Sequence, residues 1–341
     1  MRRKEHEIQR DLEDGLDYAA GEMSVAELID RYIEIKGKMK DNSVRAYSTG
    51  INRIHKDAFG QRRIRDVKLS DAKRWYLSLH DEGLKFNTIN VVHCLMRPAF
   101  EMAVNDDIIR KNPFKFKLAE LIPYDAEERV ALTKDQVEQY LSFIREHGSG
   151  NYYNDIVILA GTGMRVSELY GLTKSDLDFE RRRIYVSKQL CRTADKPYFV
   201  TEPKSKSGNR CIPMSDSVCE AFRRELQRRA VPKIESIIDG HSGFIFLDKN
   251  GMPKVAMNLQ GYMRCMQKKY AGLHGESVPK VMPHILRHTF CTNAHYAGLD
   301  DKSLQTIMGH SRIEETFNTY THTDYDTVQR AFDSITLAFN G

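Results

Sequence analysis

The sequence His284-Ile285-Leu286-Arg287-His288 brings two histidines and an arginine together in the last quarter of a 341-residue chain. Gly309-His310-Ser311 follows it, and Thr316-Phe317-Asn318-Thr319-Tyr320-Thr321-His322 comes next. His284 and Arg287 are three residues apart, so one face of a helix would present both side chains. Together with the tyrosine, this pattern predicts a site that holds a phosphodiester.

A second stretch, Gly163-Met164-Arg165-Val166-Ser167-Glu168, carries another arginine upstream. The planar guanidinium of arginine binds two phosphate oxygens at once and keeps its charge. Glu168 follows Arg165 by about one helical turn, so it can support the arginine from the same side of a helix. Taken alone, the same spacing is typical of an exposed Arg–Glu pair.

Covalent cleavage of a phosphodiester without a metal makes defined demands on a site. That reaction needs a nucleophile, cations for the non-bridging oxygens, a group that manages the nucleophile's proton, and an acid for the departing 5′-oxygen. Preorganised donors aimed at the charge that develops on the phosphate contribute most. Tyrosine has an ordinary pKa of roughly 10 and is a weak nucleophile, so neighbouring cations must favour its phenolate.

The motifs resemble the tyrosine recombinase (phage integrase) family over most of the chain, and its conjugative-transposon branch above others. The resemblance implies that Arg165 and Arg287 hold the scissile phosphate while Tyr320 attacks it. His310 would donate a hydrogen bond to the phosphate, and His284 would accept a proton or a hydrogen bond near the nucleophile. The implied catalytic residues are Arg165, Lys204, His284, Arg287, His310 and Tyr320, and the supporting residues are Glu168, Lys206 and His288.

The lysine of this set belongs to Glu202-Pro203-Lys204-Ser205-Lys206-Ser207-Gly208-Asn209-Arg210-Cys211-Ile212-Pro213. This segment resembles the strand–turn–strand that carries the general-acid lysine in the family. Lys204 matches the lysine of the family's Pro-Lys-Thr form, with serine in place of threonine. Lys206 lies two residues away, on the same face of a strand, and competes for the role. A basic hairpin that only grips the DNA backbone is the alternative.

No metal or cofactor is expected at this site. His284 and His288 are four residues apart, a spacing that zinc can use, but the chain has no HExxH motif and suggests no third ligand. The six cysteines form no CxxC pair, which argues against a zinc ribbon and a disulfide framework.

The net charge of +5 and the pI of about 8.7 permit nucleic-acid binding without demanding it. Clustered basic residues give candidate DNA contacts, with a solvated surface as the alternative for each cluster: Lys36, Lys38, Lys40, Arg45 and Arg210. No apolar run approaches the roughly 20 residues that cross a bilayer, and the charged start is not a signal peptide. We therefore expect a cytoplasmic, DNA-associated bacterial protein without a membrane partner.

Helical periodicity dominates the pattern, with short strands near 183–186, 198–200 and 211–213, so we expect a mainly α fold with a small antiparallel β-sheet (α+β). A capping box at Ser24-Val25-Ala26-Glu27 opens the first helix. The expected divisions are a charged segment or linker at 1–22 without an arm-binding domain, a helical domain at 23–115, a linker at 116–130, a catalytic domain at 131–324 and a tail at 325–341.

The resemblance implies that the helical domain is a core-binding (SAM-like) domain that closes with the catalytic domain as a clamp around duplex DNA. The expected function is site-specific recombination, as integrase and excisionase of a mobile element, through a 3′-phosphotyrosyl intermediate and without ATP. Expected partners are double-stranded DNA, three further copies in a homo-tetramer on which the tail docks, an excisionase directionality factor and a host DNA-bending protein. The alternatives are a type IB topoisomerase and a DNA-binding regulator that has lost catalysis.

Overall fold

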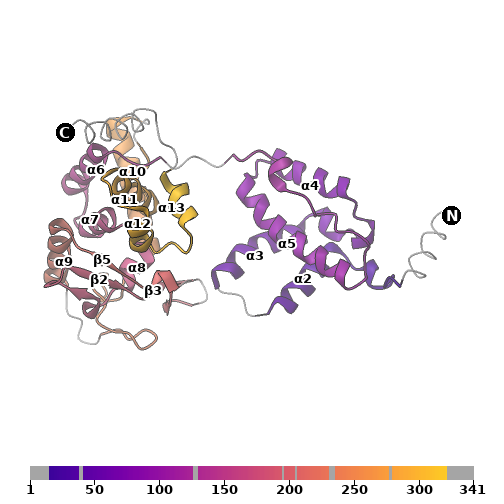
Figure 1. The fold of residues 1–341 in the computed structure, drawn as a ribbon, viewed down its shortest axis with the longest axis horizontal. Coiled ribbons are helices and arrows are strands. Elements are labelled where there is room, and N and C mark those ends of the chain that lie inside the picture. Colours follow the sequence, from indigo (N-terminus) through magenta and orange to yellow (C-terminus); the bar gives the residue numbers. More distant parts are fainter. Residues whose placement is uncertain are drawn as a thin grey trace, which may run out of the picture. The chain divides into compact units, whose positions relative to one another are not determined.

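The computed structural model describes residues 15–37, 41–125, 130–193, 196–203, 206–229, 235–275 and 279–320. The chain divides into two compact units, Met1–Glu128 and Arg129–Gly341 (Figure 1). Helices make up most of the described residues, whose strands form two small antiparallel sheets. This confirms the predicted fold class. The predicted tail at 325–341 lies outside the described residues. Among the helices that the structure describes, none is both long and apolar enough to span a membrane.

The longer helices of the first unit, within its described residues, are α2 (Val25–Lys36), α3 (Asp41–Lys56), α4 (Leu69–Asp81) and α5 (Phe86–Asn105). The capping box predicted at the start of α2 is confirmed. The Ser24 hydroxyl accepts a hydrogen bond from the Glu27 N–H at 3.2 Å, and the Glu27 carboxylate accepts one from the Ser24 N–H at 2.7 Å. Pro98 lies inside α5, which continues past it.

Aromatic rings fill much of the core of this unit. Phe59 stacks on Trp75 with ring centroids 4.4 Å apart, and Phe114 meets Phe59 edge-on at 6.2 Å. Leu118 and Ile122 are buried in the same core. The residues from 116 to 122 therefore pack with the helical unit, which corrects the predicted linker at 116–130.

The second unit, in its described part, contains eight α-helices and the strands. The helices are α6 (Lys134–His147), α7 (Tyr153–Thr162), α8 (Val166–Gly171), α9 (Asp216–Arg228), α10 (Ala256–His274), α11 (Pro283–Tyr296), α12 (Asp301–Met308) and α13 (Ile313–Tyr320). Helix α7 packs between α9 and α11, and α11, α12 and α13 contact one another (Figure 1). The last three helices therefore bring His284, Arg287, His310 and Tyr320 into one region.

The strands lie between α8 and α9 along the chain. One sheet has the order β1 (Leu177–Asp178), β2 (Arg183–Val186) and β5 (Arg210–Pro213), and the other pairs β3 (Gln189–Cys191) with β4 (Phe199–Thr201). In the first sheet Ile184 lies opposite Ile212, and both are buried. Residues alternate along β5, with Arg210 and Ile212 facing the interior.

A buried polar cluster joins α7 and α9 to the segment before α10. Lys254 Nζ lies 3.2 Å from Asp155 Oδ2 and 3.5 Å from Glu225 Oε1. The Tyr170 hydroxyl, on α8, also donates to Asp155 Oδ2 at 2.8 Å. Burial, opposed by the charge of Lys254, raises the pKa of Asp155 to about 6. One lysine thus faces two carboxylates in the interior of the unit.

We expect Asp155 to make the stability of this unit pH-dependent. Its pKa in the folded state lies above the ordinary 3.8, so the protonated carboxyl stabilises the fold at low pH, and this contribution is lost as pH rises through about 6. Relative to Asp155→Asn, the wild-type free energy of unfolding should fall by up to about 3 kcal/mol between about pH 4 and about pH 7. Urea unfolding followed by circular dichroism measures it. Parallel pH curves for the two proteins would contradict it.

Candidate active site

The start of α8 carries the first arginine of the predicted site. Arg165 is the residue that precedes α8, and Glu168 lies one turn into the helix. The Arg165 N–H donates to Glu168 Oε2 at 2.8 Å, while its Nη1 donates to Oε1 at 2.9 Å. The Glu168 side chain is 3% exposed, but that of Arg165 is 43% exposed. The buried Glu168 therefore anchors Arg165 and leaves the arginine side chain partly exposed to solvent.

Arg210, the first residue of β5, binds the same carboxylate. Its Nη2 donates to Glu168 Oε2 at 2.7 Å and its Nη1 donates to Oε1 at 3.1 Å. The Arg210 side chain is only 1% exposed. This placement contradicts the prediction that Arg210 contacts DNA, because its guanidinium is turned inward onto Glu168.

A third guanidinium comes from Arg287 on α11. Its Nη1 donates to the Gly163 carbonyl at 2.8 Å, and its Nη2 donates to the Met308 carbonyl at 2.6 Å. These bonds tie α11 to the end of α7 and to the end of α12. Burial, and then the positive charge of Arg165, lower the pKa of Arg287 to about 9, so the group remains cationic at neutral pH.

Two glycines allow the ends of α7 and α12 to pack closely against their neighbours. Gly163 ends α7 in a left-handed conformation with φ of 63°, and a Cβ there would lie 2.4 Å from the Phe290 ring. Gly309 ends α12 with φ of 66°, and a Cβ there would lie 2.9 Å from Arg210 Cδ. A left-handed backbone favours glycine. Both glycines therefore let a helix end sit directly against the arginine-bearing elements.

His310 follows the second glycine and is buried. Its Nδ1 lies 2.9 Å from the Thr316 hydroxyl on α13. When that hydroxyl donates to Nδ1, the neutral ring carries its proton on Nε2 and can donate it to an anion. Tyr320 is the last residue of α13, one helical turn after Thr316, and its side chain lies outside the described part of the chain.

The structure describes only some of the remaining predicted residues, and for others it describes the backbone alone. His284 is exposed at the second position of α11, with Arg287 and the half-buried His288 on the next turn. Lys206 lies in the turn Lys206–Gly208, but its side chain, like that of Arg45 on α3, is not described. Lys204, Lys38 and Lys40 lie outside the described residues.

Lys36, a candidate DNA contact, lies in the first unit at the end of α2. Its ammonium donates to the hydroxyls of Tyr32 at 3.0 Å and Tyr47 at 3.3 Å. Hydrogen bonding to Tyr32 is the main reason that its pKa is raised, so the group is fixed as a cation.

The electrostatic balance of the site is strongly positive. Burial opposes the ionisation of Glu168, but the hydrogen bonds and charge of Arg210, with the charge of Arg165, outweigh it and lower its pKa to about 2. Three guanidinium groups and one carboxylate give a local charge of 3 − 1 = +2 at neutral pH. The site can therefore receive an anion with two negative charges shared among its oxygens. Among the described residues, no three His, Cys, Asp or Glu side chains are grouped as metal ligands.

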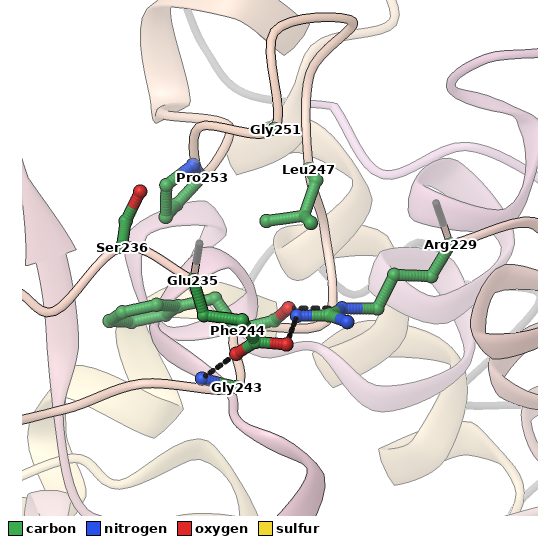
Figure 2. A pocket seen from close by; sticks show the side chains of 8 residues that line it. All are labelled: Arg229, Glu235, Ser236, Gly243, Phe244, Leu247, Gly251 and Pro253. Carbon is green, nitrogen blue, oxygen red and sulfur yellow. Dashed lines mark hydrogen bonds and ion pairs between the residues drawn. The ribbon is translucent and has the colours of Figure 1, made fainter. Parts of the chain in front are cut away.

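A tight surface pocket, lined by Arg229, Glu235 and Phe244 among others, shares no residue with this cluster (Figure 2). Arg229 borders it, and its Nη2 donates to the Glu235 carboxylate at 2.7 Å while its Nε donates to the Phe244 carbonyl at 2.8 Å. Here one buried arginine is matched by one carboxylate. The pocket contains none of the predicted site residues.

Known proteins resemble the chain over nearly its whole length. Residues 131–327 match the model of the phage integrase family. The transposase of transposon Tn916 from Enterococcus faecalis is 38% identical over 329 residues, which is 96% of this chain and 81% of that protein. A structure of the Tn1549 transposon integrase with circular intermediate DNA is 42% identical with a TM-score of 0.86, covering 92% of this chain and 99% of that one. A λ integrase dimer on a core site shares the fold, at 18% identity and a TM-score of 0.67 over 88% of this chain and 78% of that one.

We expect Glu168→Gln to destabilise the second unit by about 3 to 5 kcal/mol, because it leaves Arg210 buried without its countercharge. Urea unfolding at neutral pH measures the change. The matched control is Glu220→Gln, since Glu220 accepts from Arg224 at 2.9 Å in an exposed pair on α9. Exposed pairs contribute less than about 1 kcal/mol. Equal losses in the two variants would contradict a special role for the buried pair.

Proposed function

The chain belongs to the phage integrase family and is a tyrosine recombinase, an enzyme that cuts and rejoins DNA; on that premise we propose how its residues do so. The catalytic residues are Arg165, Lys204, His284, Arg287, His310 and Tyr320. The observation that carries the proposal is the imbalance of three guanidinium groups around the single carboxylate of Glu168. A scissile phosphodiester supplies one negative charge, and a second develops on its oxygens when the phenolate attacks.

Three side chains hold the phosphate. The Arg165 side chain is partly exposed to solvent beside Glu168, so it binds non-bridging oxygens directly. Arg287 adds positive charge beside it and is fixed by the Gly163 and Met308 carbonyls. His310 donates its Nε2 proton to the phosphate while Thr316 holds Nδ1. These donors are set before DNA binds, so they favour the charge that develops during attack.

The reaction exchanges one phosphodiester for another of similar energy. The Tyr320 oxygen attacks phosphorus, the bond to the 5′-oxygen breaks, and a 3′-phosphotyrosine and a free 5′-hydroxyl result. His284 accepts the phenol proton or stabilises the phenolate. A 5′-hydroxyl from a second duplex then attacks the phosphotyrosine and releases Tyr320. Neither ATP nor a metal ion is consumed, because the covalent link conserves the bond energy.

The departing 5′-oxygen needs a proton, and a lysine in the turn before β5 supplies it. Lys204 is favoured because it matches the lysine of the family's Pro-Lys-Thr form, and Lys206, at the start of the turn Lys206–Gly208, is the competitor. The turn precedes Arg210, which binds Glu168 and so connects it to Arg165.

The wider assembly follows from the chemistry. Exchange between two duplexes cuts four strands, and one tyrosine per chain cuts one strand. We therefore propose a homo-tetramer on DNA, with the segment 325–341 docking on a neighbouring copy.

The Tn1549 relative is described with circular intermediate DNA, which supports a role as integrase and excisionase of a conjugative transposon. The helical unit, with Lys36 as one cation, completes a clamp on the core site. An excisionase factor and a DNA-bending host protein would set direction.

Tyr320→Phe should abolish the covalent adduct on a suicide duplex with a nicked core site, because the phenylalanine ring has no oxygen to attack phosphorus. Denaturing gels detect the adduct, and gel shifts should show DNA binding nearly unchanged. Tyr296→Phe, at an exposed tyrosine of α11, is the control and should cleave like wild type. An adduct that persists in Tyr320→Phe would overturn Tyr320 as the nucleophile.

Lys204→Ala should slow cleavage of that duplex by roughly 10² to 10⁴-fold, as expected for loss of a general acid. A duplex with sulfur in place of the bridging 5′-oxygen should restore most of the rate, because a thiolate leaves without a proton. Lys206→Ala is the matched comparison and should cleave both duplexes at similar rates. The reverse result would assign the acid to Lys206. A loss that sulfur does not restore in either variant would remove both lysines from the role.

A further inference from the structure

Arg210 touches three separate parts of the described candidate site. Its two Nη atoms bind Glu168 on α8 at 2.7 and 3.1 Å. Its Nε donates to the Ile307 carbonyl on α12 at 2.6 Å, and its Nη1 also donates to the Gly208 carbonyl at 3.1 Å. One buried side chain therefore bonds to α8, to α12 and to the turn that precedes its own strand.

The contact with α12 fixes the segment that leads into His310. The last carbonyls of a helix have no partner within the helix and carry partial negative charge. In α12 the Ile307 carbonyl accepts from Arg210 and the Met308 carbonyl accepts from Arg287. Gly309 follows, and its lack of a side chain leaves room for the Arg210 stem.

The contact with the turn fixes the end of the segment that carries the candidate acids. A Cβ on Gly208 would lie 2.1 Å from Pro203 Cβ, so the two ends of this turn lie against each other. Arg210 holds the Gly208 carbonyl. Lys204 and Lys206 lie between Pro203 and Gly208 in the sequence. Arg210 therefore holds the Gly208 end of the segment 203–208, which we call the lysine turn.

We infer that Arg210 is a positioning residue that holds the lysine turn in register with the Arg165–Glu168 pair, so that proton donor and phosphate clamp act on one phosphodiester. This inference rests on the proposed recombinase function. If Arg210 served only as a structural ion pair, its loss would lower stability and slow every chemical step equally. If Arg210 positions the lysine that acts as general acid, its loss would slow protonation of the leaving 5′-oxygen more than the other steps.

The test compares Arg210→Lys with Arg229→Lys in single-turnover cleavage of the suicide duplex, with either oxygen or sulfur at the bridging 5′ position. Lysine keeps the charge but loses the two-pronged geometry. Arg229 is the control because its side chain is as deeply buried, at 2% exposure, and binds a carboxylate and a carbonyl away from the predicted site residues (Figure 2). Thermal unfolding and DNA affinity are measured on each variant first.

Arg210→Lys should cleave the oxygen duplex at least about tenfold more slowly than wild type and recover most of that loss on the sulfur duplex. Arg229→Lys should cleave both at the wild-type rate. An equal loss on both duplexes in Arg210→Lys would overturn the inference, as would the same sulfur-specific recovery in Arg229→Lys.

A second variant covers the case in which Arg210→Lys does not fold. Gly208→Ala pushes the turn against Pro203 and leaves the Arg210–Glu168 pair in place, so it should show the same recovery on sulfur. If Gly208→Ala showed no recovery on the sulfur duplex, that result would also reject the inference. Failure of the proposed function looks different, because wild type would then form no adduct with either duplex.

Discussion

One buried carboxylate allows three arginines to be packed around one point of the protein interior. Each oxygen of Glu168 accepts two hydrogen bonds, one from Arg165 and one from Arg210. Without that carboxylate the guanidinium groups would repel one another, and the desolvation of Arg210 would be uncompensated. With it, one arginine is neutralised and buried, and the others keep their charge for an anion. The contact between α8 and β5 depends on this interaction.

Main-chain carbonyls complete the framework. Arg287 and Arg210 both donate into the C-terminal end of α12, and Arg287 also donates to the end of α7. Helix ends supply acceptors that the helices cannot use themselves. Each arginine is therefore aimed by the fold before a phosphate arrives, which lowers the cost of reorganising the site during the reaction. His310 gains its position from the same helix end.

The sequence was sufficient for the features that local rules govern. The capping box at Ser24 and the spacing of Arg165 and Glu168 are such features, because a single helical turn decides both. Arg210 was mistaken for a surface residue, although strand alternation places it on the same side as the apolar Ile212. The sequence does not indicate the partner of Arg210, because Glu168 lies far from β5 along the chain. The linker was misjudged because the buried Leu118 and Ile122 sit in a stretch without helical period.

Burial alone does not distinguish a functional arginine from a structural one in this chain. The side chains of Arg210 and Arg229 are both almost fully buried, and each binds a carboxylate and at least one main-chain carbonyl. At the pocket in Figure 2, Arg229 and Glu235 pair one cation with one carboxylate. Around Glu168 the cations outnumber the carboxylate, and the excess is stable only when an anion is bound or water screens the exposed Arg165. The excess of charge, rather than its burial, is what makes this place a site for a phosphodiester.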